Sequence, residues 1–186
     1  MNKHREADGS ITLPLAEMFP VMQERLAQGQ EVVFTVTGNS MSPFIRHQRD
    51  QVALVACDPT TLKVGDVPLY RRDNGQFVLH RIVERDDGCT RTVWGEKKAR
   101  PSAADDLEYT MLGDAQWQLE PHIRPDQILA VATAFVRLGR RWKCDSPAYR
   151  RHRLMWHRLL PVRRWLMALD RRLWWRFRRL FPYKNL

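Results

Sequence analysis

The most constraining feature of the sequence is an Asn-Gly pair between two runs of alternating apolar residues. Residues 67–72 (Val-Pro-Leu-Tyr-Arg-Arg) precede Asp73-Asn74-Gly75, and residues 76–83 (Gln-Phe-Val-Leu-His-Arg-Ile-Val) follow it. Asn-Gly readily adopts the backbone of a tight hairpin turn, and a period of two is typical of strands. The pattern therefore predicts a β-hairpin. Pro68 has no N–H to donate, so we expect it to place its strand at a sheet edge or to interrupt it.

Other short apolar runs extend this pattern through residues 31–138. Strands are expected at residues 31–36, 51–56, 90–94, 109–112, 115–119 and 128–136, with turn residues between them. A short helix should precede them, because apolar residues recur there at helical spacing: Leu15, Met18, Met22 and Leu26. Many short strands separated by turns predict a compact, coiled, mostly-β domain.

The charge is divided unequally along the chain. Residues 137–186 hold 16 of the 31 Lys and Arg but only Asp145 and Asp170, a balance of +14. Residues 1–136 hold the other 15 basic residues and 19 acidic ones, a balance of −4. Apolar residues recur at helical spacing in the basic part, and Pro161 should divide it into two helices. We therefore expect three parts: an N-terminal helix and lead-in (1–30), a β domain (31–138) and a basic helical tail (139–186).

The tail has the composition of a helix that lies in a membrane interface. Five of the seven tryptophans are found there among the arginines: Trp142, Trp156, Trp165, Trp174 and Trp175. Arginine opposite Trp, Leu and Phe favours binding to an anionic membrane surface. A helical hairpin packed on the β domain is an alternative, and nucleic-acid binding is a less expected one. Neither a signal peptide nor an apolar run long enough to span a membrane is found, so we expect a cytoplasmic protein or one held peripherally on the cytoplasmic membrane face.

The cysteines do not indicate a metal site. Cys57, Cys89 and Cys144 are scattered, with no Cys-x-x-Cys pair and no histidine spacing suited to zinc. An odd number argues against a disulfide framework and for a reducing compartment. No metal and no cofactor is expected.

A candidate nucleophile follows the first expected strand. Residues 37–43 read Thr-Gly-Asn-Ser-Met-Ser-Pro. Gly38 permits backbone geometry closed to other residues, and Pro43 ends strand pairing. Ser40 would thus stand at the end of a rigid element, which suits a nucleophile. A surface turn rich in small polar residues is the alternative.

A serine hydroxyl needs a neighbouring base, and His80 is the best candidate. His80 belongs to the expected strand 76–83, on one face with Val78 and Ile82, and an imidazole needs little change of pKa to act near neutral pH. No lysine lies in an expected strand of the β domain. The alternative is a hydrogen-bonded core histidine.

Four segments, taken in order, resemble the type I signal peptidases. They are residues 38–43 (Gly-Asn-Ser-Met-Ser-Pro), 65–67 (Gly-Asp-Val), 80–83 (His-Arg-Ile-Val) and 113–114 (Gly-Asp). The first also resembles the self-cleaving LexA-type repressors. The resemblance covers about residues 31–136 and implies a coiled, partly open, β-barrel-like catalytic fold.

The resemblance implies a role for three side chains. Ser40 matches the nucleophile, and His80 matches the base of the signal peptidases that use histidine in place of lysine. Asp114 matches the acidic residue that orients the base or supports the site. The backbone N–H groups of Ser40 and Met41 are expected to form the oxyanion hole. The implied activity is a serine endopeptidase that cleaves an extended leader or signal-like peptide, without a cofactor.

The chain departs from the family pattern at three points. Ala115-Gln116 follows the Gly-Asp pair where Asn-Asn is usual, Pro68 replaces an expected β-former, and the membrane-spanning helix of signal peptidases is missing. Two other functions therefore stay open: a non-catalytic peptide- or lipid-binding protein that retains the fold, and a DNA-binding regulator that uses the arginine-rich tail. No helix-turn-helix pattern precedes the β domain, which argues against a LexA-like repressor.

Overall fold

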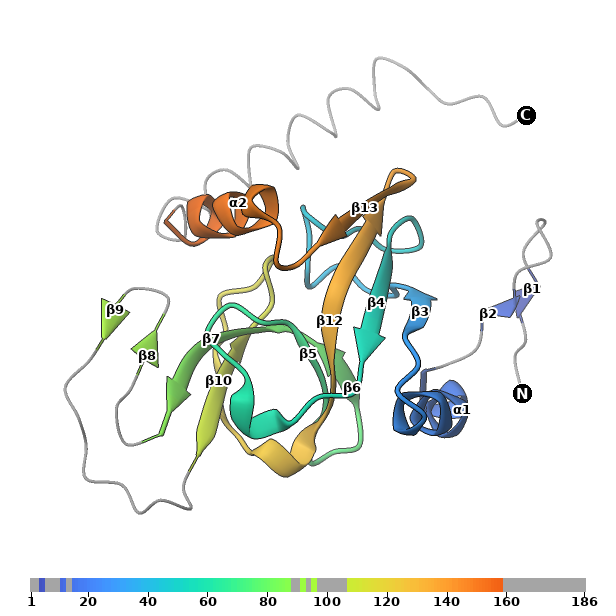
Figure 1. Cartoon of the computed structure of the whole chain (residues 1–186), viewed down its shortest axis with the longest axis horizontal. Coiled ribbons are helices and arrows are strands. Elements are labelled where there is room, and N and C mark those ends of the chain that lie inside the picture. Colours follow the sequence, from blue (N-terminus) through green and yellow to red (C-terminus); the bar gives the residue numbers. More distant parts are fainter. Residues whose placement is uncertain are drawn as a thin grey trace.

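A computed structural model describes residues 4–5, 11–12, 15–87, 91–92, 95–96 and 107–158. The described chain is mostly β, with a short helix near its N-terminus (Figure 1). Its helices, strands and 3-10 turns follow in chain order: β1 (His4–Arg5), β2 (Ile11–Thr12), α1 (Leu15–Ala27), β3 (Val32–Thr35), β4 (Gln51–Val55), η1 (Pro59–Thr61), β5 (Pro68–Arg71), β6 (Phe77–Leu79), β7 (Arg81–Asp86), β8 (Arg91–Thr92), β9 (Gly95–Glu96), β10 (Glu108–Leu112), β11 (Glu120–Ile123), η2 (Pro125–Gln127), β12 (Ile128–Arg137), β13 (Arg140–Lys143) and α2 (Pro147–Arg158).

Two antiparallel sheets make up the body. The first has the order β3-β4-β12-β5-β6, and β13 also pairs with β12. The second has the order β11-β10-β7-β8-β9. Figure 1 shows β12 as the long central strand, with β4 and β3 beside it and the sheets curled toward a half-barrel. The expected mostly-β, coiled body is therefore confirmed, as is the short N-terminal helix.

The two sheets are joined at His80. The sequence predicted one strand over residues 76–83, but the structure divides it into β6, in the first sheet, and β7, in the second. His80 is the single residue between them. The prediction of one continuous strand was wrong because alternation along the chain does not reveal where the chain passes from one sheet to the next.

The predicted hairpin is present, but Pro68 does not place its strand at an edge. β5 begins at Pro68 and lies between β12 and β6. A proline is tolerated as the first residue of a strand. Contact with β12 also continues before Pro68. The backbone N–H of Ala132 donates a hydrogen bond to the carbonyl oxygen of Val67 at 3.0 Å.

The strand predicted at residues 115–119 is not formed. Residues 113–119 make a turn and an irregular loop, and β11 begins only at Glu120. Trp117 and Leu119, whose apolar character suggested a strand, are 56% and 45% exposed. Their alternation therefore does not reflect burial against a sheet.

The packed body continues beyond residue 138, where the sequence placed the start of the tail. β13 pairs with β12 from Ala134 to Arg137. The first turn of α2 then inserts Tyr149, 1% exposed, against Phe44 and Phe135. Residues 159–186, which hold the second helix expected after Pro161, lie outside the described residues.

The buried position of Tyr149 gives a test of this arrangement. We expect Tyr149→Ala to lower the free energy of unfolding by about 3–5 kcal/mol, the usual cost of truncating a large buried aromatic side chain. Leu154→Ala, at a site 55% exposed on the same helix, should change it by no more than about 0.5 kcal/mol. Urea denaturation of both variants measures the difference. Equal losses would contradict the packing of α2 on the body.

Candidate active site

Ser40 is held in a turn whose neighbours are anchored in the core. Met41, Phe44 and Ile45 are at most 2% exposed, whereas Ser40 is half-buried. Gly38 has φ +110°, a region that favours glycine, and donates its N–H to His47 Nδ1 at 2.9 Å. The apolar side chains on one side of the turn thus fix the serine at the surface of the body.

His80 lies at the junction of β6 and β7 and is 2% exposed. Its Nδ1 atom is 3.2 Å from Tyr70 Oη and 3.2 Å from Glu120 Oε1. Tyr70 comes from β5 and Glu120 from the first position of β11, so side chains of two strands lie beside the ring. The strand-face position predicted for His80 is therefore replaced by a buried corner.

Ser40 and His80 line the same groove. One wall is the segment from Val36 to Met41, and the other is the hairpin from Asn74 to His80. Leu15 of α1, Arg72 and Gln116 complete the lining of a cavity of about 800 Å³. The two residues that the sequence singled out, separated by 40 positions, are thus brought to one open cavity.

The four segments on which the resemblance was based are joined in two pairs by close backbone contacts. The backbone N–H of Gly65 donates to Ile82 O at 2.8 Å, and that of Ile82 donates to Asp66 O at 2.9 Å. The N–H of Ala115, directly after the Gly-Asp pair, donates to Ser40 O at 2.7 Å. A Cβ atom at Gly113 would lie 2.8 Å from Ser40 O, so the close approach of these two loops requires glycine.

Asp114 is buried, 2% exposed, and its carboxylate is bound by Arg81. Arg81 Nε donates to Oδ1 at 2.9 Å and Nη2 to Oδ2 at 2.6 Å. The remaining Nη1 of Arg81 donates to Gly65 O at 3.0 Å and to Tyr149 Oη at 2.8 Å. These contacts make Asp114 part of a structural ion pair, while the carboxylate beside His80 Nδ1 is that of Glu120. The resemblance implied that Asp114 orients the base. These contacts do not favour that role.

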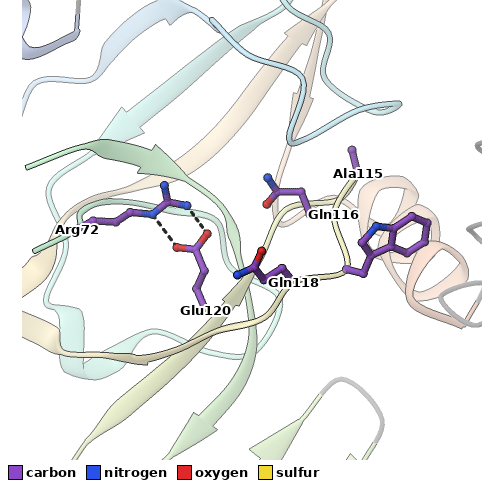
Figure 2. Close-up of a pocket in the computed structure, with 6 residues that line it drawn as sticks. Arg72, Ala115, Gln116, Gln118 and Glu120 are labelled. Carbon is purple, nitrogen blue, oxygen red and sulfur yellow. Dashed lines mark hydrogen bonds and ion pairs between the residues drawn. The ribbon is translucent and has the colours of Figure 1, made fainter. Parts of the chain in front are cut away.

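Glu120 belongs to a network that the sequence analysis missed. Arg72 donates two hydrogen bonds to its carboxylate, one from Nε to Oε2 at 2.9 Å and one from Nη2 to Oε1. Tyr70 Oη donates to Oε2 at 2.6 Å. Figure 2 shows Arg72 and Glu120 joined by these contacts. Both line a second cavity, of about 520 Å³, together with Ala115, Gln116, Trp117 and Gln118. Arg72 and Gln116 line both cavities, so the two adjoin.

The surroundings of His80 favour its neutral form. Burial lowers the pKa of the imidazole, the carboxylate of Glu120 raises it, Arg72 lowers it and Asp114 raises it; the net pKa lies below the ordinary value of 6.5. Burial alone would raise the pKa of Glu120, but the hydrogen bonds from Arg72 and Tyr70 outweigh it and hold that pKa below its usual value. A neutral histidine beside an ionised glutamate results near neutral pH.

The predicted oxyanion donors lie at the same groove. Ser40 and Met41 both line it. Among the described residues, no backbone carbonyl accepts a turn or loop hydrogen bond from the N–H of either residue. The role of these two groups as oxyanion donors stays a prediction.

The described residues show neither a metal-binding cluster nor an activated cysteine. Among them, no three His, Cys, Asp or Glu side chains are arranged to hold a metal ion. Burial raises the pKa of the Cys57 thiol to about 11 and that of Cys144 to about 12, which disfavours the reactive thiolate. Cys89 lies outside the described residues.

Comparison with known proteins assigns no family to this arrangement. No protein-family model matches the chain, and no curated protein matches its sequence. Within the part of the chain that the structure describes, neither helix has the length and apolar character needed to cross a bilayer.

The ion pair of Arg81 gives a test of the role of Asp114. We expect Asp114→Asn to lower the free energy of unfolding by about 3–5 kcal/mol, because it leaves a buried guanidinium without its counter-charge. Asp126→Asn, which removes an exposed partner of Arg124, should cost less than about 1 kcal/mol. Urea denaturation compares the two variants. A small loss for Asp114→Asn would contradict the structural role.

Proposed function

We propose that this chain is a serine endopeptidase that cleaves an extended peptide by a Ser40/His80 mechanism. The observation that carries the proposal is the presence of Ser40 and His80 on one groove, with a carboxylate behind the histidine. The resemblance to type I signal peptidases in four ordered segments supports the same reaction.

The chemistry follows from the states of the two side chains. Neutral His80 accepts the proton of Ser40 Oγ as the oxygen attacks the peptide carbonyl, forming a tetrahedral intermediate. The imidazolium then gives that proton to the leaving amine, and the peptide C–N bond breaks to leave an acyl-enzyme. Water, deprotonated by the same imidazole, then attacks the ester carbonyl. The bond between that carbon and Ser40 Oγ breaks, the imidazolium returns the proton to Oγ, and the acid product is released. The backbone N–H groups of Ser40 and Met41 stabilise the oxyanion in both steps.

The substrate is proposed to bind as an added strand. Among the described strands, β6 lies at an edge of its sheet and pairs with β5 alone, while Phe77, Val78 and Leu79 line the groove. An extended peptide can use the unpaired backbone edge of β6 and reach the site beside His80. Leader or signal-like peptides have this extended form, and a preference for small residues before the scissile bond is carried over from the resemblance alone.

We expect Ser40→Ala and His80→Ala each to reduce cleavage of a proteome-derived peptide library by at least about 1,000-fold. In the wild-type protein, kcat/KM should fall as the pH falls through the pKa of His80, with a midpoint below 6.5, because protonation removes the base. Mass spectrometry of the new peptide termini provides the measurement.

His122→Ala is the matched control, since His122 is 76% exposed and does not line the groove. Thermal unfolding of each variant excludes loss of the fold. Full cleavage by Ser40→Ala would overturn the peptidase proposal and favour a non-catalytic binding protein.

We also propose that the chain is held on the cytoplasmic membrane face through its basic C-terminal part. The exposed side of α2 combines cations with apolar side chains: Arg150, Arg151, Leu154, Met155 and Arg158. This combination suits a helix at an anionic lipid surface. The sequence beyond α2 continues with arginines and tryptophans of the same pattern.

We expect reversal of three helix charges (Arg150→Glu, Arg151→Glu, Arg158→Glu) to weaken binding to phosphatidylglycerol-containing vesicles by at least about 100-fold. Each basic residue near an anionic surface contributes about 1 kcal/mol. Sedimentation with vesicles, and with phosphatidylcholine vesicles as reference, measures the effect in the full-length protein.

A matched triple reversal at exposed sites of the body (Arg25→Glu, Lys63→Glu, Arg71→Glu) should bind nearly as well as the wild-type protein. Equal losses in both triple variants would contradict a role specific to α2. Tighter, steeply salt-dependent binding to duplex DNA than to vesicles would instead support the nucleic-acid alternative.

A further inference from the structure

Behind His80, on the side of its Nδ1 atom, lies a cluster of three polar side chains. Tyr70, Arg72 and Glu120 come from the β5 strand, the residue that follows it and the start of β11. They are hydrogen-bonded to one another, and two of them are 3.2 Å from the same ring nitrogen. Neither sequence spacing nor the resemblance assigns a function to this cluster.

The hydroxyl of Tyr70 can only accept a hydrogen bond from His80. A tyrosine has one hydroxyl proton, and that proton is directed to Glu120 Oε2 at 2.6 Å. Burial raises the pKa of Tyr70, and the neighbouring Glu120 raises it further, so the hydroxyl keeps its proton. The contact of 3.2 Å between Oη and Nδ1 is then a hydrogen bond donated by the ring.

The carboxylate of Glu120 is the second acceptor at the same nitrogen. Its two bonds from Arg72 hold it ionised, and an ionised carboxylate has no proton to donate. Oε1 lies 3.2 Å from Nδ1. Because both neighbours of Nδ1 are acceptors, the proton of the neutral imidazole belongs on Nδ1. The lone pair is then on Nε2, the nitrogen that the base needs to present.

We propose that Glu120, held by Arg72 and Tyr70, is the positioning residue that fixes His80 as its Nδ1–H tautomer. This inference rests on the proposed peptidase function and deepens it: it gives Glu120 the role that the resemblance implied for Asp114. Asp114 is engaged through both carboxylate oxygens by Arg81. Arg72 has two effects on this pair. It keeps Glu120 ionised, and it opposes the increase in the His80 pKa that Glu120 alone would cause.

The charges that face His80 predict opposite effects for two substitutions. Glu120 and Asp114 raise the pKa of the imidazole, whereas burial and Arg72 lower it. Glu120→Gln removes a negative charge, so the pKa of His80 should fall further. Arg72→Gln removes a positive charge, so the pKa should rise. A residue that merely supported the fold would not shift this pKa in a direction set by its charge.

The experiment is ¹⁵N–¹H NMR of the histidine rings in full-length protein carrying Ser40→Ala, with the His80 signals assigned from an additional His80→Gln variant. The ring nitrogen shifts identify the protonated nitrogen, and a pH series gives the pKa. We expect the Nδ1–H tautomer, a lower pKa in Glu120→Gln and a higher one in Arg72→Gln. Glu108→Gln, which removes the partner of exposed His122, should leave both observables at His80 unchanged.

Activity gives a second readout in protein with Ser40 intact. We expect Glu120→Gln to lower kcat by about 100-fold or more with little change in KM, because the base is less often in the required tautomer. Tyr70→Phe keeps Glu120 as an acceptor and should retain the Nδ1–H tautomer with a smaller loss of kcat. This second variant keeps the test valid if Glu120→Gln fails to fold.

The outcomes separate this inference from the proposed function. An Nε2–H tautomer, or a His80 pKa that neither Glu120→Gln nor Arg72→Gln moves, overturns the role of Glu120 even if Ser40→Ala abolishes cleavage. The expected tautomer and shifts in a protein whose cleavage does not depend on Ser40 would overturn the peptidase proposal and leave the positioning network in place.

Discussion

The arrangement of the site depends on one buried guanidinium. Arg81 binds Asp114, the carbonyl of Gly65 and the hydroxyl of Tyr149, and therefore joins β7 to the loop after β10, to the turn before β5 and to α2. A buried cation needs all its donors satisfied, and few positions can supply three acceptors at once. These hydrogen bonds hold Arg81 in place. Because Arg81 directly follows His80, the His80 ring has little freedom to move.

Beside this structural ion pair lies a second one with a different character. Arg81 and Asp114 are almost fully buried, whereas Arg72 and Glu120 are partly exposed and line a cavity. The first pair holds loops together; the second lies next to a titratable ring and changes the free energy of its protonation. Two carboxylates near one histidine are thus distinguished by their partners and by their access to solvent.

Local features of the site could be predicted from the sequence because their causes are local. The turn around Ser40 follows from a glycine with positive φ and from the apolar residues after it, which enter the core. The hairpin at Asn74-Gly75 follows from turn chemistry and alternation. Of the two alternatives for Pro68, the edge position was wrong, and so was the strand at residues 115–119. Pairing partners and loop exposure depend on segments far away in the chain.

The sequence by itself determined that the chain is mostly β with a short N-terminal helix and that its C-terminal part is strongly basic, and it singled out Ser40 and His80 as candidates. The tertiary structure decided which residues lie beside His80. Glu120 is 40 positions from His80 and Tyr70 is 10 away, with no spacing rule that connects them. Only the register of β10 with β7 and β11, and the curl that brings β11 back to β5, place that carboxylate at the ring. Side-chain distances across two sheets are set by register and curvature, which spacing along the chain does not encode.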